Sequence, residues 1–252
     1  MVARRAGLTL VELLVMLGVL AVLAGVALVG VRGAMESGRE AQSLGNLRGH
    51  AQVFVGYAGD WDQVWPIFED PAEWRALGVL ITQRTSYFGG QTKAWPRLMT
   101  EAGYYEGWSG RREFFTSRAF SDPETYARTG WGSYRYGAVF LARPEYWRPE
   151  ERTGLEQLGA TRVTEVLFPS RKALHNHLAV RTTWAESVPS SEVLGGVHLS
   201  FVDGSAGAMG VGDVADGYEG GPGMSGGMSM RDRTAIASYT IGGVRGWDVL
   251  GR

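Results

Sequence analysis

The sequence contains no cysteine, and only two of its 25 basic residues, Lys93 and Lys172, are lysines. The lack of thiols excludes disulfides, thiolate metal ligands and cysteine nucleophiles. The formal net charge is −1, so the chain has none of the basic excess that nucleic-acid binding uses, and no nucleic-acid partner is expected. Proline is absent before Pro66, which leaves the N-terminal part of the chain free to form a long helix.

The segment from Leu8 to Val31 has the composition of a membrane span. It lacks lysine, arginine, aspartate, asparagine and proline, and follows Arg4 and Arg5. As a helix it would be about 36 Å long, enough to cross a hydrocarbon core of about 30 Å. A cleaved secretory signal and a plain signal anchor are the simpler alternatives. The apolar run is longer than the core of a secretory signal, and neither alternative explains Glu12.

Glu12 is a carboxylate inside this apolar run. A carboxylate at mid-membrane costs on the order of 2.5–3.5 kcal/mol, and less near an end, so such a residue is a functional candidate whose partner must be sought. The span holds no basic side chain, but cleavage before Leu8 would create an α-amino group. On one helix that amine and Glu12 would be fixed about a turn apart. We therefore expect Glu12 to pair with the amine of a neighbouring subunit.

The stretch "GLTLVELLV" resembles the processing site of type IV pilins and type II secretion pseudopilins. Gly7 would precede the cut, and Leu8 would follow it, where phenylalanine is commoner. Thr9 comes next, and Glu12 would be the fifth residue of the mature chain. The resemblance implies that a prepilin peptidase removes residues 1–7 and N-methylates Leu8. It also implies that Glu12 pairs with an adjacent subunit's amine while a filament grows.

An amphipathic pattern continues the predicted helix beyond the span. Apolar residues recur at spacings of three and four and form one stripe, namely Leu44, Leu47, Ala51, Phe54 and Ala58. The pattern predicts one helix that ends at Gly59–Asp60. The same stretch resembles the "NLR…Y…D…P" run of pseudopilins, with matching residues at Asn46, Leu47, Arg48, Tyr57, Asp60 and Pro66.

The remaining chain is predicted to form an antiparallel sheet. Alternation and turn residues favour strands within 132–144, 162–170, 176–186 and 233–250, and a short helix within 94–108. The clearest hairpin covers 195–211, with a two-residue turn at Asp203–Gly204. Residues 212–230 are rich in Gly, Ser and Met and are interpreted as a loop.

This hairpin also resembles the "F-x-DG" element of many bacterial pseudopilin-like proteins, through Phe201, Asp203 and Gly204. The histidine that those relatives place several residues earlier is missing, and no role is carried over to His198. The predicted fold is α+β and pilin-like, a long N-terminal helix packed on a small antiparallel sheet. Its parts would be a leader (1–7), a transmembrane half-helix (8–31), an amphipathic half-helix (32–60) and a globular domain (61–252).

Candidate ligand sites in the globular region are weak. His175 and His177 have the spacing of two ligands on one strand face, but no clear carboxylate partner accompanies them. Asp203, Asp213 and Asp216 lie among glycines, and some pseudopilins bind calcium in a C-terminal loop. Their spacing matches no EF-hand, and turn formation is the simpler explanation. No serine-hydrolase or phosphate-loop motif is present, so neither an enzyme nor a resident cofactor is expected.

The sequence thus predicts a pseudopilin subunit of a type II secretion-type filament. Its expected partners are other pilin-like subunits, prepilin peptidase and an inner-membrane assembly platform. The N-terminus would lie in the cytoplasm and the globular domain outside the inner membrane, because long domains translocate largely regardless of charge. A type IV pilus subunit for adhesion or motility is the first alternative. An alternative of another class is a membrane-anchored, glycan-binding module that uses the tryptophan-rich region.

Overall fold

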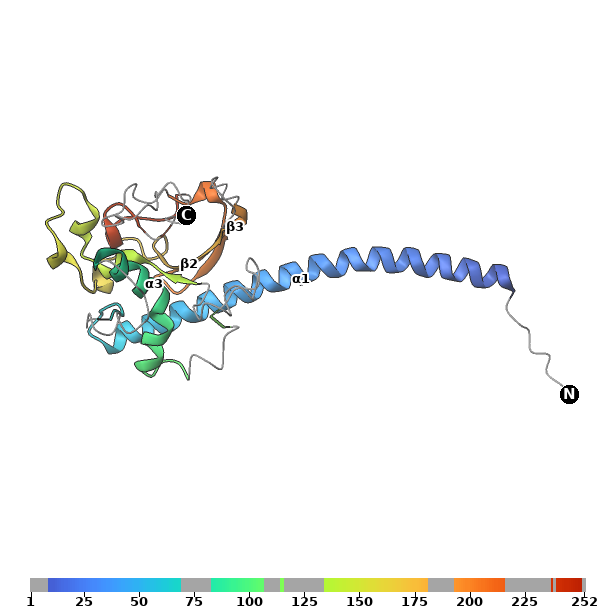
Figure 1. Ribbon diagram of the computed structural model, residues 1–252, viewed down its shortest axis with the longest axis horizontal. Coiled ribbons are helices and arrows are strands. Elements are labelled where there is room, and N and C mark those ends of the chain that lie inside the picture. The colour runs from blue at the N-terminus through green and yellow to red at the C-terminus, as the bar shows by residue number, and fades with distance from the viewer. Residues whose placement is uncertain are drawn as a thin grey trace. The chain divides into compact units, whose positions relative to one another are not determined.

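The computed structural model describes residues 9–68, 83–106, 114–115, 134–180, 193–215, 237 and 239–250. The helix α1 (Leu10–Asp60) is followed by the helix α3 (Gln83–Glu101) and four strands (Figure 1). The chain divides into two compact units, Met1–Ala41 and Gln42–Arg252. In the first unit the described structure is the N-terminal part of α1, and the second unit contains the sheet. The architecture is α+β, as predicted.

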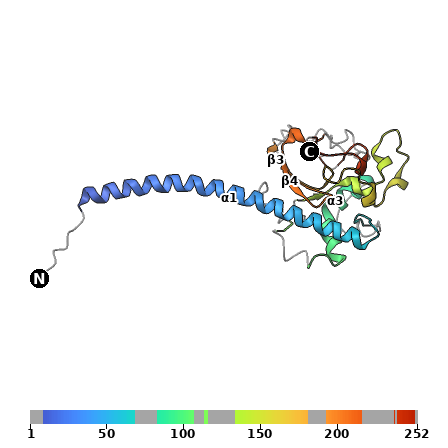
Figure 2. The ribbon, with the colours of Figure 1, turned by 180° about the vertical axis from the view of Figure 1, so that it is seen from behind.

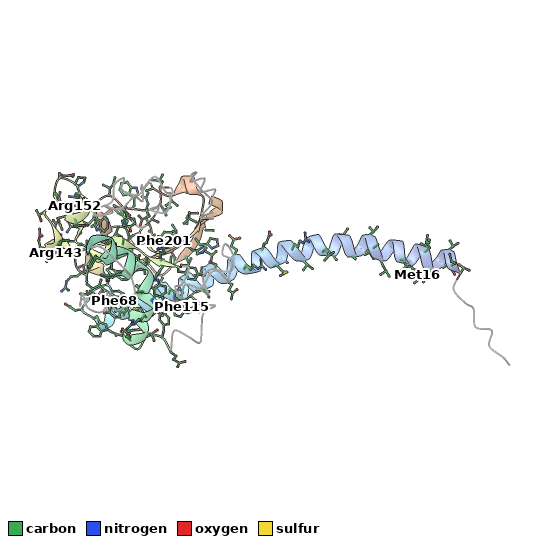
Figure 3. All side chains as sticks on the ribbon, in the orientation of Figure 1. Met16, Phe68, Phe115, Arg143, Arg152 and Phe201 are labelled. Atoms are coloured by element: carbon green, nitrogen blue, oxygen red, sulfur yellow. The ribbon has the colours of Figure 1, made fainter. Side chains whose placement is uncertain are left out.

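Helix α1 is continuous over 51 residues and ends at Asp60, as the sequence pattern predicts. Every described side chain from Leu10 to Gln42 is exposed, and Met16 projects from the ribbon in Figure 3. This part is long and apolar enough to cross a membrane. Buried positions begin at Ser43. Of the predicted stripe, Leu44 is half-buried, and Leu47, Ala51, Phe54 and Ala58 are buried.

The second half of α1 packs on an antiparallel sheet in the order β1-β2-β3-β4. The strands are β1 (Arg135–Tyr136), β2 (Ala173–Val180), β3 (Val193–Phe201) and β4 (Ala206–Met209). Figure 2 shows β3 and β4 side by side. In the register of β2 with β3, His177 lies opposite His198 and His175 opposite Ser200.

The predicted hairpin is present as β3 and β4, but its turn has a different type. The Gly204 amide donates to the Phe201 carbonyl, and the Phe201 amide donates to the Ser205 carbonyl. Gly204 has φ +83°, whereas Asp203 is not among the residues with positive φ. A two-residue turn of type I′ needs positive φ at both central residues. The prediction of a two-residue turn was therefore wrong, and the strands are joined by a three-residue loop whose last residue is Gly204.

Several other predicted strands are largely irregular and contain short 3₁₀ helices. In the described part of 132–144, β1 is the only strand, and Ala138–Leu141 forms a 3₁₀ helix with all four residues buried. In 162–170, Val163–Glu165 is also a 3₁₀ helix. Of the predicted strand at 233–250, residues 233–236 and 238 lie outside the described structure, and Gly243–Arg245 is a 3₁₀ helix. Alternation predicts a strand with one buried face. At Ala138–Leu141 all side chains are buried, so there is no contrast between a buried and an exposed face. In such a segment, alternation in the sequence does not indicate a strand.

Two further predictions are met in part. The predicted helix within 94–108 lies in α3, which begins earlier and contains Pro96. The predicted strand at 176–186 coincides with β2 up to Val180, and residues 181–186 lie outside the described structure.

Hydrophobic side chains cover both faces of the sheet. The larger core contains Phe54 of α1 and the buried tryptophans Trp65, Trp95 and Trp147. A smaller core includes Val197, Leu199 and Phe201 of β3 together with Val214 and Val249. The alternate residues of β3, His198 and Ser200, are buried as well. Polar side chains of β3 are thus enclosed between the sheet and α1.

Candidate functional site at the start of helix α1

Thr9 and Glu12 are joined by reciprocal hydrogen bonds at the N-terminus of α1. The backbone amide and the hydroxyl of Thr9 both donate to Glu12 Oε2, each at 2.8 Å. The Glu12 amide lies 3.3 Å from Thr9 Oγ1, to which it donates. This arrangement is a capping box, in which the residue before the helix and the third helical residue satisfy each other's free amides. In the single chain, Glu12 therefore caps the N-terminus of α1 together with Thr9.

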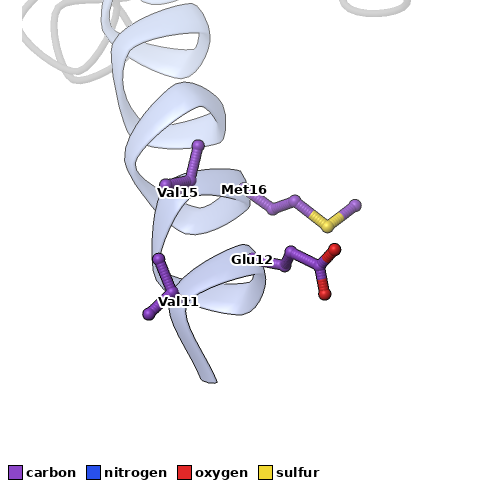
Figure 4. A pocket seen from close by; sticks show the side chains of 4 residues that line it. All are labelled: Val11, Glu12, Val15 and Met16. Carbon is purple, nitrogen blue, oxygen red and sulfur yellow. The ribbon is translucent and has the colours of Figure 1, made fainter. Parts of the chain in front are cut away.

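The Glu12 carboxylate lies among exposed apolar residues of α1. In Figure 4 the Glu12 side chain projects beside that of Met16, and Val11 and Val15 lie next to each other on the other side of the view. These four residues line a shallow, open hollow. Both valines and Met16 are more than half exposed. In a bilayer or against another helix, these side chains would exclude water from the carboxylate. A carboxylate in such surroundings needs hydrogen bonds or an opposite charge. Thr9 supplies the hydrogen bonds, and among the described residues no ion pair with Glu12 is present.

The two residues of the predicted cleavage site, Gly7 and Leu8, lie outside the described structure. The helix begins at Leu10 rather than Leu8, and the Glu12 carboxylate already contacts the amide of Thr9, the residue next to Leu8. The side chain of Glu12 thus reaches back to the residue before the helix. The pairing of Glu12 with the amine of a neighbouring subunit stays a prediction, because Leu8 lies outside the described residues.

The capping role of Glu12 was readable from the sequence. Threonine followed three residues later by glutamate, before an apolar run, is the pattern of a capping box. The charge of Glu12 in a membrane span does not by itself indicate this capping role. The pattern accounts for Thr9 as well as Glu12, since both members of the pair are needed.

His175 and His177, the weak metal candidates of the sequence, are both buried. His175 Nδ1 lies 2.9 Å from Ser200 Oγ, and the ring of His177 contacts that of Tyr134. In the part of the chain that the structure describes, no three His, Asp or Glu side chains are grouped so that they could hold a metal ion. Burial lowers the pKa of His177 to about 3 and that of His175 well below its usual value.

The calcium candidates make local backbone contacts. Asp203 Oδ1 accepts the Ser205 amide at 2.9 Å, and Asp213 Oδ2 accepts the Gly210 amide at 3.2 Å. These contacts are those of turn residues. Asp216 and most of the 212–230 loop lie outside the described residues, so the calcium site stays a prediction.

No known protein family, characterised protein or solved structure matches this chain. The resemblance to pilins therefore depends on the motif residues themselves. It is accompanied by two structural features of the described chain, a long exposed apolar helix and a carboxylate held at the start of that helix.

Proposed function

We propose that this chain is a pilin-like subunit that prepilin peptidase cleaves between Gly7 and Leu8 and that then assembles into a filament of a type II secretion-type system. The observation that carries the proposal is the position of Glu12. Its carboxylate is held by Thr9 at the start of a helix whose apolar side chains are exposed. Cleavage would create an α-amine on Leu8, which directly precedes Thr9 in the sequence.

The exposed apolar part of α1 needs to be covered. Its leucines, valines and methionines are mostly more than half exposed from Leu10 to Val31. Burial of apolar surface contributes about 25 cal/mol per Å², so this part of the helix belongs in lipid or among other helices. A subunit that moves from the membrane into a filament exchanges one apolar environment for the other. The carboxylate then gains an amine partner during the exchange.

Processing is tested by mass spectrometry of the mature N-terminus, on protein recovered from its native membranes. The expected chain starts at an N-methylated Leu8, and Gly7→Ala should leave most of the chain uncut. A chain that still starts at Met1, or one cut downstream of Glu12, would contradict the proposal and leave a plain anchor or signal.

Glu12→Gln separates pairing from helix capping. Glutamine is accepted at this position of a capping box, so the variant keeps the hydrogen bonds to Thr9 while it removes the charge. We expect normal processing and membrane insertion but a strong loss of filament incorporation. Glu12→Ala should lose both functions of the side chain. Normal filaments from Glu12→Gln would show that the residue only caps the helix.

Mixed assembly distinguishes pairing between subunits from pairing within one subunit. A Glu12→Gln subunit still carries its own amine, so with wild-type protein it can join a neighbour that supplies the carboxylate. Co-expression should then rescue incorporation of a tagged variant. If the pairing is intramolecular, the tagged variant will stay out of the wild-type filaments.

Filament length distinguishes the secretion-type system from a surface pilus for adhesion or motility. At native expression we expect short assemblies that stay within the cell envelope, with the prepilin peptidase and a membrane platform as partners. Electron microscopy of intact cells is the measurement. Long surface filaments that contain this chain would favour the pilus.

A further inference from the structure

Trp61 is displayed on the surface directly after the end of α1. Among the described tryptophans, Trp65, Trp95 and Trp147 are at most 1% exposed, whereas Trp247 is 43% and Trp61 55% exposed. Burial of a large aromatic side chain stabilises a protein, and the exposed part of Trp61 does not contribute this free energy.

The exposed ring is held in place from one side. The Tyr57 ring stacks on it, with the ring centroids 5.6 Å apart and the planes 12° from parallel. Tyr57 in turn contacts the Tyr104 ring, whose centroid lies 5.3 Å away. The near-parallel Tyr57 ring restricts the orientation of the indole, and more than half of the Trp61 surface stays exposed.

The turn that follows Trp61 has an unusual backbone. Asp62 and Gln63 are consecutive non-glycine residues with positive φ, at +50° and +61°, and such residues cost of order 1–3 kcal/mol each. Arg162 holds the turn by donating to the carbonyl and the carboxylate of Asp62, both at 2.9 Å. The Val163 amide donates to the Gln63 carbonyl at 2.8 Å. This turn lets Trp61 point outward while Trp65 enters the core.

Two aspartates, Asp60 and Asp62, flank Trp61 in the sequence. Tyr104 donates to Asp60 Oδ2 at 2.6 Å, and the Asp62–Arg162 ion pair has side chains that are 83% and 52% exposed. The core of a protein–protein interface is a contiguous apolar patch from which charged residues are depleted. A single exposed indole whose two sequence neighbours are aspartates, one of them paired with Arg162, does not have that composition. This segment combines one exposed aromatic ring with charged groups that can form hydrogen bonds.

We propose that Trp61, Asp60, Asp62 and Arg162, hereafter the Trp61 platform, bind a neutral polysaccharide. The C–H face of a pyranose ring would stack on the indole, and its hydroxyls would bond the Asp62 carboxylate and the Arg162 guanidinium. The platform is open, whereas sites for small molecules are concave and enclose most of the ligand. An open surface suits a chain that runs across it. The platform carries two acidic groups and one basic group, which favours a neutral polymer over an anionic one.

The test is affinity electrophoresis of the full-length protein in mild detergent, through native gels that contain mixed-linkage β-glucan, mannan or xylan. Binding to insoluble cellulose and chitin is measured in parallel. We expect the wild-type protein to be retained by at least one of these polymers. Trp61→Ala should weaken the retention at least about tenfold, equivalent to about 1.4 kcal/mol. This proposal does not depend on the filament function.

Trp247→Ala is the matched control, because Trp247 is 43% exposed and has the Arg171 guanidinium over its ring. It should bind as the wild-type protein does. Trp61→Phe keeps an aromatic face and should retain part of the binding, and Trp61→Leu keeps only hydrophobicity and should not. An unchanged thermal midpoint shows that each variant is folded. Failure of the wild-type protein to bind any of the five polymers, or an equal loss in Trp247→Ala, overturns the proposal.

Discussion

His198 Nδ1 lies 3.1 Å from Ser43 Oγ, and this contact joins β3 to the second half of α1. Both side chains are only 1% exposed. Tyr134 adds a third member, since its hydroxyl donates to Ser43 Oγ at 3.2 Å. Enclosed polar groups must be matched to be tolerated. The position of the helix on the sheet is therefore set by hydrogen bonds as well as by apolar packing.

Ser43→Ala should destabilise the globular unit by about 1–3 kcal/mol, because it removes a buried partner of His198 and Tyr134. The measurement is the thermal or urea midpoint of the full chain in mild detergent. Ser37→Ala is the control, since Ser37 is an exposed residue of the same helix, and it should leave the midpoint unchanged or slightly raised. Equal effects of the two substitutions would show that the contact contributes nothing.

Acidification should destabilise the protein through its buried histidines. Burial lowers the pKa of His50 and of His177 from 6.5 to about 3. Between these pH values the unfolded chain binds protons that the folded chain does not. The stability is therefore fully present above pH 6.5 and is lost as the pH falls, by about 1.4 kcal/mol per pH unit for each histidine.

The described groups that contact these histidines are neutral or basic. His50 Nε2 donates to the Phe114 carbonyl, and Nδ1 lies 2.8 Å from the Tyr105 hydroxyl. His177 faces His198 and Arg135, both of which disfavour a second positive charge. We expect the urea midpoint to fall steadily from pH 7 to pH 4. The slope should be shallower in His50→Gln, which cannot titrate, and an identical slope would contradict the linkage.

A buried ion pair fixes the C-terminal segment beside β2. Lys172 Nζ lies 3.2 Å from Asp248 Oδ2, and the two side chains are 0% and 2% exposed. Asp248 also accepts the Ala173 amide and the Thr240 hydroxyl. Asp248→Asn leaves the lysine without its counter-ion and should cost about 3–5 kcal/mol.

The surface pair Arg97–Glu101 is the control for this prediction. Its side chains are 49% and 50% exposed, and exposed pairs contribute at most about 1 kcal/mol. Glu101→Gln should therefore shift the urea midpoint little. A small effect of Asp248→Asn, comparable with that of Glu101→Gln, would show that the buried pair is not needed for stability.

Two helix glycines should respond differently to alanine. A Cβ on Gly56 would have nothing within 4 Å, whereas one on Gly49 would lie 3.3 Å from Phe114 Cζ. Gly56→Ala should stabilise the chain by about 0.5–1 kcal/mol through helix propensity. Gly49→Ala should gain less, because the phenyl ring must move. The thermal midpoint of each variant measures its change in stability. Equal gains would show that the Phe114 ring moves aside at no cost in free energy.

The sequence by itself determined the long helix and its two environments. Its apolar run, its lack of proline before Pro66 and its stripe from Leu47 to Ala58 depend on local periodicity, which a sequence displays directly. The β3–β4 hairpin was predictable for the same reason. The capping pair Thr9–Glu12 was also readable, since its members are three residues apart.

Only the tertiary structure decided which polar residues are enclosed. Ser43 and His198 are 155 residues apart in sequence, and neither position carries a local signal for its partner. The outward position of Trp61 and the inward position of Trp65 likewise depend on Arg162, which holds the intervening turn from a distant part of the chain. Contacts between distant segments arise when the helix is laid on the sheet, so local periodicity cannot encode them.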